Sequence, residues 1–131
     1  MSSLKAFQLN VEALDQISRI KKSVGINKNN VICRWAFMLS LKEPGRISDL
    51  NLTYDSSGRG EISWETFGGE FSAIYLALLK QRMHQEEVSI NTENLKTHIL
   101  HHINRGLGYI LGSGNIRSIS HLIALTIEEP K

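Results

Sequence analysis

Hydrophobic residues near the amino-terminal end of the chain follow first an extended and then a helical pattern. Residues 5–9 are expected to form a short extended segment, and Asn10 is expected to cap a helix after it. Apolar residues then recur every three or four positions, and Gly25 follows the last of them. This spacing predicts an amphipathic helix that ends at Gly25.

Two later segments are apolar on nearly every side of a helix. The first covers residues 27–42 and is ended by Pro44 and Gly45. The second covers residues 68–83 and follows Thr66, which is expected to cap it. A helix with apolar residues all round is buried on more than one side. Both segments are therefore predicted to lie in the interior or in an interface.

The remaining segments complete the predicted secondary structure. Residues 45–65 are expected to be irregular, with a short strand around residues 62–64, where apolar and polar residues alternate. A fourth helix is predicted over residues 92–105, with Asn91 as its cap. After a glycine-rich stretch, a last short helix is predicted over residues 115–126.

The predicted fold is all-α: a compact bundle of four to five helices with an irregular central segment, in one domain of residues 1–131. A chain of this length has one core, which is too small to cover two helices that are apolar all round. The surplus apolar surface predicts assembly into an oligomer. The alternative is a compact monomer in which residues 45–65 cover that surface.

Composition places the chain among ordinary globular proteins, with 41% hydrophobic and 21% charged residues. No apolar run approaches the roughly 20 residues that a membrane span needs, and no signal-peptide pattern opens the sequence. The one cysteine, Cys33, excludes an internal disulfide, and its apolar helix makes an inert, structural thiol the expectation. These features predict a cytoplasmic protein.

Basic residues concentrate in the first part of the chain. Residues 1–50 contain eight basic and four acidic residues, a net charge of +4, whereas the remainder contains seven basic and nine acidic residues, a net charge of −2. Four basic residues lie where the first two predicted helices meet: Arg19, Lys21, Lys22 and Lys28. Such a cluster suits a phosphate backbone. The alternative is that these charges complement a helix end and that Asp15 pairs with Arg19.

Two glycine-rich stretches are candidates for anion binding through backbone N–H groups. The stretch Gly58–Glu70 is flanked by glutamates that would repel a phosphate, so packing by Trp64 and Phe67 is its predicted role. The turn Gly112–Arg117 has no nearby acid and precedes a predicted helix, which makes it the better anion site. The alternative is a plain flexible turn.

Three histidines follow one another on the predicted fourth helix: His98, His101 and His102. Their spacing suits two imidazoles on one metal, but Glu93 is the one acid close to them in the sequence, so no metal site is predicted. A polar stripe on the same helix is expected to be solvated or to face phosphate: Asn94, His98, His101 and Arg105. His102 is expected at the edge of the core.

Two parts of the sequence carry a resemblance to a known family. One is Gly58–Glu70 with residues 74–82 after it, and the other is the first helix pair with Ile32-Cys33-Arg34 and Leu39-Ser40-Leu41. Over residues 4–83 the chain resembles DndE, the small E subunit of the bacterial DNA phosphorothioation system. The resemblance implies a helical subunit that forms a tetramer and binds duplex DNA, with nicked DNA favoured.

The resemblance also implies partner subunits: a cysteine desulfurase, an iron–sulfur protein and an ATPase, which together replace a non-bridging phosphate oxygen with sulfur. The family's DNA contact is made by basic side chains, which by position fall here on Arg19, Lys21, Lys22, Lys28 and Arg34.

The predicted function is a DNA-binding subunit of a phosphorothioation complex that is not an enzyme and has no cofactor, metal or catalytic residue of its own. Two alternatives stay open. One is a metal-dependent DNA nickase that uses Glu93 and the histidines of the fourth helix. The other is an adaptor that bridges the larger subunits without touching DNA.

Overall fold

The computed structural model describes residues 4–47, 52–54 and 60–112. Four long helices make up most of this part: α1 (Val11–Val24), α2 (Asn29–Lys42), α4 (Ser72–Gln85) and α5 (Thr92–Gly112). The smaller elements are two strands, a short helix and a 3-10 turn: β1 (Ala6–Gln8), β2 (Glu61–Ser63), α3 (Trp64–Gly68) and η1 (Gly69–Phe71). The helix predicted over residues 115–126 lies outside the described residues.

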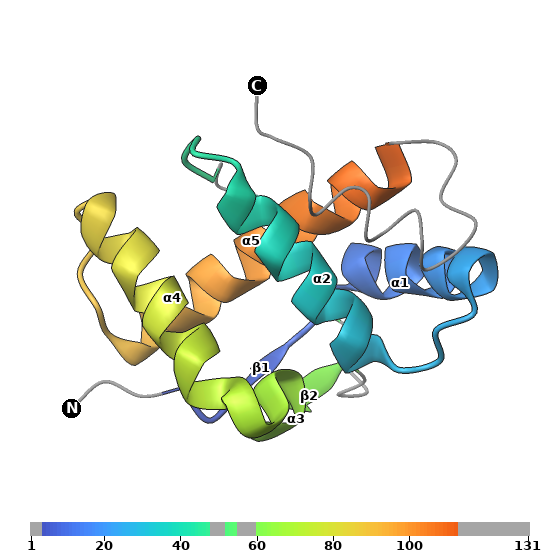
Figure 1. The fold of residues 1–131 in the computed structure, drawn as a ribbon, viewed down its shortest axis with the longest axis horizontal. Coiled ribbons are helices and arrows are strands. Elements are labelled where there is room, and N and C mark those ends of the chain that lie inside the picture. The colour runs from blue at the N-terminus through green and yellow to red at the C-terminus, as the bar shows by residue number, and fades with distance from the viewer. Residues whose placement is uncertain (1–3, 48–51, 55–59, 113–131) are drawn as a thin grey trace.

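The four long helices are arranged around the crossing of α2 and α5. In Figure 1, α2 and α4 pass in front of α5, with α4 at one end of the molecule and α1 at the other. The contact between α2 and α5 is the most extensive one between any two elements. Helix α5 also contacts α1, α4 and β1, so it serves as the common support of the fold.

A glycine allows α2 and α5 to approach each other closely. Gly106 of α5 faces the backbone of Ala36 in α2, and a Cβ atom placed on Gly106 would overlap the Ala36 carbonyl group. Only glycine leaves room for this contact. The large side chains on either side of it are fully buried: Ile32, Phe37, Ile99, Ile103 and Leu107.

Aromatic rings attach the small sheet and α3 to this core. Strands β1 and β2 pair antiparallel with Phe7 opposite Ile62. The Phe7 ring meets the Phe67 ring edge-on at 5.6 Å, and Phe67 meets Phe37 of α2 at 5.8 Å between ring centroids. Trp64 stacks on Phe67 and donates its indole N–H to the Ser72 carbonyl at 2.9 Å. Such contacts add to the burial of the rings and fix their orientation.

The amino-terminal half follows the sequence prediction closely. The extended segment expected over residues 5–9 is β1, and the first helix ends at Gly25, whose φ of 76° is in the left-handed region that glycine favours. Two details differ. Asn10 is the N-cap residue of α1, as predicted, but its side chain makes no capping hydrogen bond, because it exchanges two hydrogen bonds with the Asn104 side chain. The second helix begins at Asn29 rather than at residue 27.

The carboxy-terminal half differs more. The helix predicted over residues 68–83 is interrupted, because Gly69 adopts φ 59° and ψ −140°. The short helix before the interruption, α3, has Ser63 as its N-cap, and the Ser63 hydroxyl accepts the Thr66 N–H at 3.0 Å. The prediction of Thr66 as the cap was therefore wrong. The predicted strand is β2, and its pairing with β1 adds a two-stranded sheet to the expected all-α fold.

The helix predicted over residues 92–105 is longer than expected. It begins at Thr92, and Asn91 caps it as predicted by accepting the Asn94 N–H at 2.8 Å. It continues through the glycines as far as Gly112. Packing against α2 outweighs the weak helix propensity of glycine here, since Gly106 belongs to the closest contact of the core.

Two arginines bind carbonyl groups in the last turn of α2 and in the residues just after it. Arg82 of α4 donates to the Leu41 and Glu43 carbonyls at 2.6 and 2.8 Å. Arg105 of α5 donates to the carbonyls of Ser40, Glu43 and Gly45 at 2.6 to 3.2 Å. Guanidinium groups are favoured at this negative end of the helix dipole. The end of α2 is therefore held from two sides.

His102 belongs to the same hydrogen-bonded cluster as Arg105 and is completely buried. The Ser40 hydroxyl accepts Arg105 Nε–H at 2.8 Å, which leaves its own hydrogen to donate to His102 Nδ1 at 2.7 Å. Burial lowers the pKa of His102 to about 3, with a further contribution from the Arg105 and Arg82 charges. His102 is therefore neutral in the folded protein, at the centre of the core rather than at its edge.

The contact at Gly106 gives a direct test of the fold. Gly106→Ala should lower the free energy of unfolding by at least about 3 kcal/mol, because the two helix backbones must move apart. Gly108→Ala is the matched control. A Cβ atom on Gly108 meets nothing within 4 Å, and the change should raise stability by about 0.5–1 kcal/mol. Urea unfolding followed by circular dichroism measures both, and equal effects of the two changes would contradict the close contact.

The buried histidine predicts how stability depends on pH. The unfolded chain takes up a proton at His102 below about pH 6.5, whereas the folded protein takes it up only near pH 3. The contribution of the neutral His102 to the free energy of unfolding is therefore fully present above pH 6.5, and it decreases as the pH falls from 6.5 towards 3. By linkage the loss should reach about 1–2 kcal/mol at pH 5. The free energy of unfolding of His102→Gln, measured over the same range, should lack this loss.

Candidate nucleic-acid interface

Three of the predicted basic residues meet at the turn between α1 and α2. Lys21 and Lys22 lie in the last turn of α1, and Lys28 is the residue that precedes α2. Lys22 and Lys28 are exposed and Lys21 is half-buried. The first turn of α2 contains no acidic residue and receives no side-chain cap from Lys28. This end of the molecule thus combines three ammonium groups with the positive end of a helix dipole.

Arg19 lies on the neighbouring face of α1 and is partly neutralised. Its guanidinium group is 3.4 Å from the Asp15 carboxylate, and both side chains are well exposed. Exposed pairs of this kind are weak, so a phosphate can compete for the arginine. Arg19 is therefore a peripheral member of the basic surface.

Arg34 is separated from the other four predicted residues. It lies in the middle of α2 and lines an apolar groove between α2 and α4, together with Trp35 and Tyr75. Six residues of helix place it about 9 Å further along the axis than Lys28. The structure thus brings together the lysines of the turn but not Arg34.

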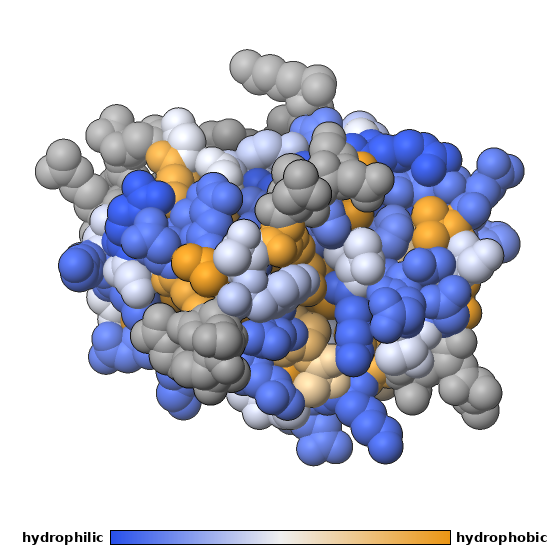
Figure 2. Space-filling model, turned by 180° about the vertical axis from the view of Figure 1, so that it is seen from behind, coloured by the Kyte–Doolittle hydropathy of each residue, from blue (hydrophilic) through white to orange (hydrophobic). Residues whose placement is uncertain are grey.

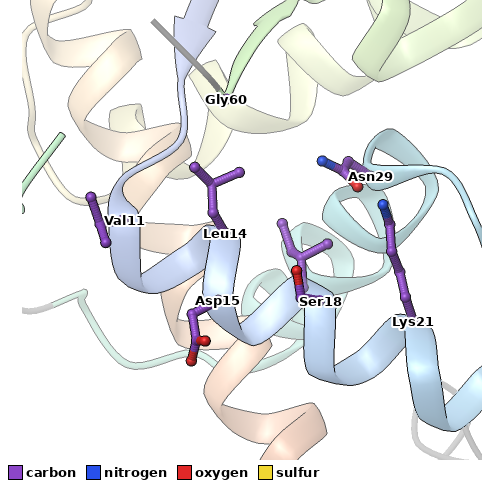
Figure 3. Close-up of a pocket in the computed structure, with 8 residues that line it drawn as sticks. Val11, Leu14, Asp15, Ser18, Lys21, Asn29 and Gly60 are labelled. Carbon is purple, nitrogen blue, oxygen red and sulfur yellow. The ribbon is translucent and has the colours of Figure 1, made fainter. Parts of the chain in front are cut away.

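A second groove opens beside Lys21. It has a volume of about 500 Å³ and lies between α1, the start of α2 and Gly60. Figure 3 shows the side chains of α1 along it, with Lys21 reaching towards Asn29 on the opposite wall. One part of its lining is apolar and the other part is polar. The apolar part contains Val11, Leu14 and Ile17, and the polar part contains Asp15, Ser18, Lys21 and Asn29.

An apolar surface covers the outer sides of α2 and α4. Phe71 and Ile74 are more than half exposed, at 52% and 56%, and Met38 of α2 is 40% exposed. Met38 lines the α2–α4 groove together with Val31, Trp35 and Tyr75, and Tyr75 is the neighbour of Ile74 along α4. Figure 2 shows the molecule from behind the view of Figure 1, and that face is mostly hydrophilic, with hydrophobic residues in separate small areas. Helix α4 buries fully only Leu79 and Met83.

The polar stripe predicted on the fourth helix is not a solvated surface. His101 is buried and donates Nδ1–H to the Thr97 carbonyl at 2.7 Å, and Arg105 is bound to the end of α2. Sequence spacing did not reveal this, because the partners of Arg105 lie about 60 residues away. Across residues 4–47, 52–54 and 60–112, no three histidine, cysteine, aspartate or glutamate side chains are grouped closely enough to hold a metal ion.

The other residues considered in the sequence are buried in the core or lie outside the described residues. Trp64 and Phe67 are buried in the aromatic core, as expected for the stretch Gly58–Glu70, whose first two residues lie outside the described part. The anion site predicted at Gly112–Arg117 also lies outside the described residues, apart from Gly112. Burial raises the pKa of the Cys33 thiol to about 12, which makes this cysteine unreactive near neutral pH.

Sequence reasoning missed the groove beside the lysines. Ser18 and Asn29 are ordinary polar residues in the sequence, and Gly60 lies more than 30 residues after both. The available signal was the spacing of residues 11, 14, 18 and 21, which places them along one side of a helix. Nothing in that spacing indicated which segment forms the opposite wall.

Comparisons with known proteins place these features in a family. Residues 6–118 match the sequence model of the family described as DNA sulphur modification protein DndE. The match extends well beyond residue 83, where the resemblance noted in the sequence ends. No curated protein matches the chain. No helix in the described residues is long and apolar enough to cross a membrane.

Solved structures show the same fold. The crystal structure of DndE from Escherichia coli B7A, involved in DNA phosphorothioation modification, has a TM-score of 0.67 and 22% sequence identity. The likeness covers 84% of this chain and 98% of that chain. A G21/24K mutant of DndE, involved in DNA phosphorothioation, has a TM-score of 0.64 and 21% identity over 82% of this chain and 97% of that chain. With a family match over residues 6–118 and this shared fold, the chain belongs to the DndE family of DNA sulphur modification proteins.

Proposed function

We propose that this protein is the DNA-binding subunit of a phosphorothioation complex, and that it holds duplex DNA through the basic turn between α1 and α2. The observation that carries the proposal is the meeting of Lys21, Lys22 and Lys28 beside a helix amino terminus that lacks acidic residues. Ammonium groups and unpaired backbone N–H groups are the partners that phosphate oxygens take in proteins.

The proposed contact is with the DNA backbone rather than with bases. The three lysines act as point charges, and no arginine, asparagine or glutamine set accompanies them in the geometry that reads a base edge. Phosphate contacts position a duplex but carry no sequence information. A nick adds a flexible joint, which lowers the elastic cost of bending DNA across a surface. This favours nicked over intact duplexes without any catalytic residue.

The proposal includes assembly into a homotetramer through the apolar surface of α2 and α4. Side chains such as Phe71 and Ile74 are too exposed for a stable monomer surface, and closed symmetry is the usual way to cover such a patch. Assembly also repeats the basic turn, so that one duplex contacts lysines from more than one copy.

The sulfur chemistry is assigned to partner subunits: a cysteine desulfurase, an iron–sulfur protein and an ATPase. In this proposal the chain is not itself an enzyme. The Cys33 thiol is buried, and His102 is held neutral by burial, so the Cys33 thiol is not suited to sulfur transfer and His102 is not suited to proton transfer. The rival proposal is an adaptor that joins these subunits without touching DNA.

The apolar surface predicts the effect of a single charge on assembly. Ile74→Glu should convert a species of about four times the 14.8 kDa chain mass into smaller ones, because the new carboxylate would be buried in the interface. Gln85→Glu, at the exposed end of the same helix, is the matched control and should leave the mass unchanged. Light scattering measures the mass. A wild-type protein that is monomeric at micromolar concentration would refute the assembly.

The basic turn predicts how binding depends on salt. With about 4–8 phosphates engaged by the oligomer, the slope of log K against log salt should be about −4 to −7. Lys21→Ala with Lys22→Ala should weaken binding to every duplex sequence alike and make this slope shallower. The control is Lys5→Ala with Lys96→Ala, which removes the same charge at exposed positions away from the turn.

The measurement is a gel shift on intact and nicked duplexes, with and without EDTA. Weaker binding by the Lys21 and Lys22 variant, without cleavage, is the expected result. An equal loss of DNA affinity in the control variant would show that the contact surface lies elsewhere. No binding to either duplex would favour the adaptor, and metal-dependent nicking would favour an enzyme.

A further inference from the structure

The described lining of the apolar groove between α2 and α4 contains one charged residue, Arg34. The other lining residues are apolar or aromatic: Val31, Trp35, Met38 and Tyr75. Within residues 4–47, 52–54 and 60–112, no ion pair joins Arg34 to an acid. If a second copy covers the groove, the guanidinium group is buried with it. Burying a charge in this way is costly unless an opposite charge meets it.

An exposed acid lies on the rim of the groove beside this arginine. A Cβ atom placed on Gly69 would lie 3.4 Å from Arg34 Nη1, so the guanidinium group lies against the bare backbone of Gly69. Glu70 follows directly in the turn η1, and its side chain is exposed. Opposite charges thus lie near each other on one rim without forming an ion pair within the chain.

The residue after this acid is an aromatic side chain that lies largely in solvent. Phe71 is 52% exposed, and Ile74 beside it on α4 is 56% exposed. Buried aromatic rings that fill a pocket on the partner are the usual anchors of protein interfaces. The groove has a volume of about 400 Å³, which is ample for such a ring. One face of the molecule therefore carries both an apolar pocket and an exposed ring.

Two-fold symmetry relates the pocket, the ring and the two charges. In a two-fold interface a patch meets its own copy, so each contact between two different residues occurs twice. An axis that carries Phe71 into the groove of a second copy runs midway between Phe71 and the groove. Because Glu70 adjoins Phe71 and Arg34 lines the groove, the same rotation brings Glu70 of one copy to Arg34 of the other.

We infer that the α2–α4 groove takes Phe71 of a second copy of this chain, and that Arg34 forms an ion pair across the interface with Glu70 of that copy. The inference rests on the assembly in the proposed function and names the contacts that select a second copy. It also separates Arg34 from the lysines of the basic turn, because Arg34 then holds the assembly together and does not contact DNA. An apolar partner without a matching acid would leave this guanidinium group buried and unpaired.

The test reverses each charge in a separate protein. Arg34→Glu places two carboxylates opposite each other in the interface, and Glu70→Arg places two guanidinium groups there, so each variant alone should have a smaller mass than the wild type. In an equimolar mixture, a chain of one variant meets a chain of the other with opposite charges at both contacts. The mass of the wild-type assembly should therefore return. Light scattering measures the mass, and circular dichroism shows that each variant is folded.

Glu65→Arg is the matched control, because it makes the same reversal at an exposed position of α3 that does not line the groove. It should assemble as the wild type does and should not restore assembly to the Arg34→Glu chains. Assembly of both reversed variants on their own would overturn the ion pair. Two folded variants that stay apart in the mixture would also overturn it, because mixing does not restore a pair formed within one chain.

The wild-type protein separates this inference from the DNA-binding proposal. A wild-type chain that is monomeric at micromolar concentration and still shifts a duplex would overturn the interface and the assembly, while the basic turn would stand as the DNA contact. An assembled wild type whose reversed variants behave as expected, but which binds no duplex, would support the interface and overturn the DNA-binding proposal.

Discussion

Where α2 crosses α5, the backbone of Gly106 lies directly against that of Ala36. This close approach brings the large buried side chains of both helices into one layer and leaves α5 free to contact α1, α4 and β1 along the rest of its length. The aromatic cluster then attaches the two strands and α3 to α2 through Phe37. The position of each peripheral element depends on this one contact.

The two ends of α2 differ in how their backbone groups are satisfied. At the carboxy-terminal end, Arg82 and Arg105 bind the last carbonyls, and Ser40 and His102 complete a buried polar group. Those two guanidinium charges are occupied inside the protein. At the amino-terminal end, the residue before the helix, Lys28, gives no side-chain cap to the backbone N–H groups, and Lys21 and Lys22 lie at the end of the preceding helix. The carboxy-terminal end of α2 is thus held in place, while the N–H groups at its amino-terminal end can bind an anion.

Much of the fold follows from local signals in the sequence. The end of α1 at Gly25 and the cap of α5 at Asn91 are set by neighbouring residues, so the sequence pattern predicts them. The break at Gly69 and the continuation of α5 through Gly106 are set by packing between distant segments, and local propensity predicts the opposite in both places.

The same distinction applies to the candidate site. The lysines lie close together in the sequence and their cluster was predictable, whereas the surroundings of Arg34 and the bonding partners of Arg105 come from other helices and were not predictable. A basic residue can serve DNA only if no carbonyl within the fold already binds it, and sequence spacing does not contain that information. Gly60, which forms the far wall of the groove, was hidden for the same reason.

Helix α2 also connects the two proposed surfaces. Its first turn belongs to the basic end of the molecule, and its outer side, with Trp35 and Met38, belongs to the apolar surface shared with α4. Three lysines on one chain engage few phosphates, and a net charge of only +2 adds little long-range attraction. If copies join through the outer side of α2, the rigid helix carries each basic turn to a fixed distance and direction from the interface. Assembly then converts several weak phosphate contacts into one binding surface of defined geometry, which is how a small and nearly neutral chain can hold a duplex firmly.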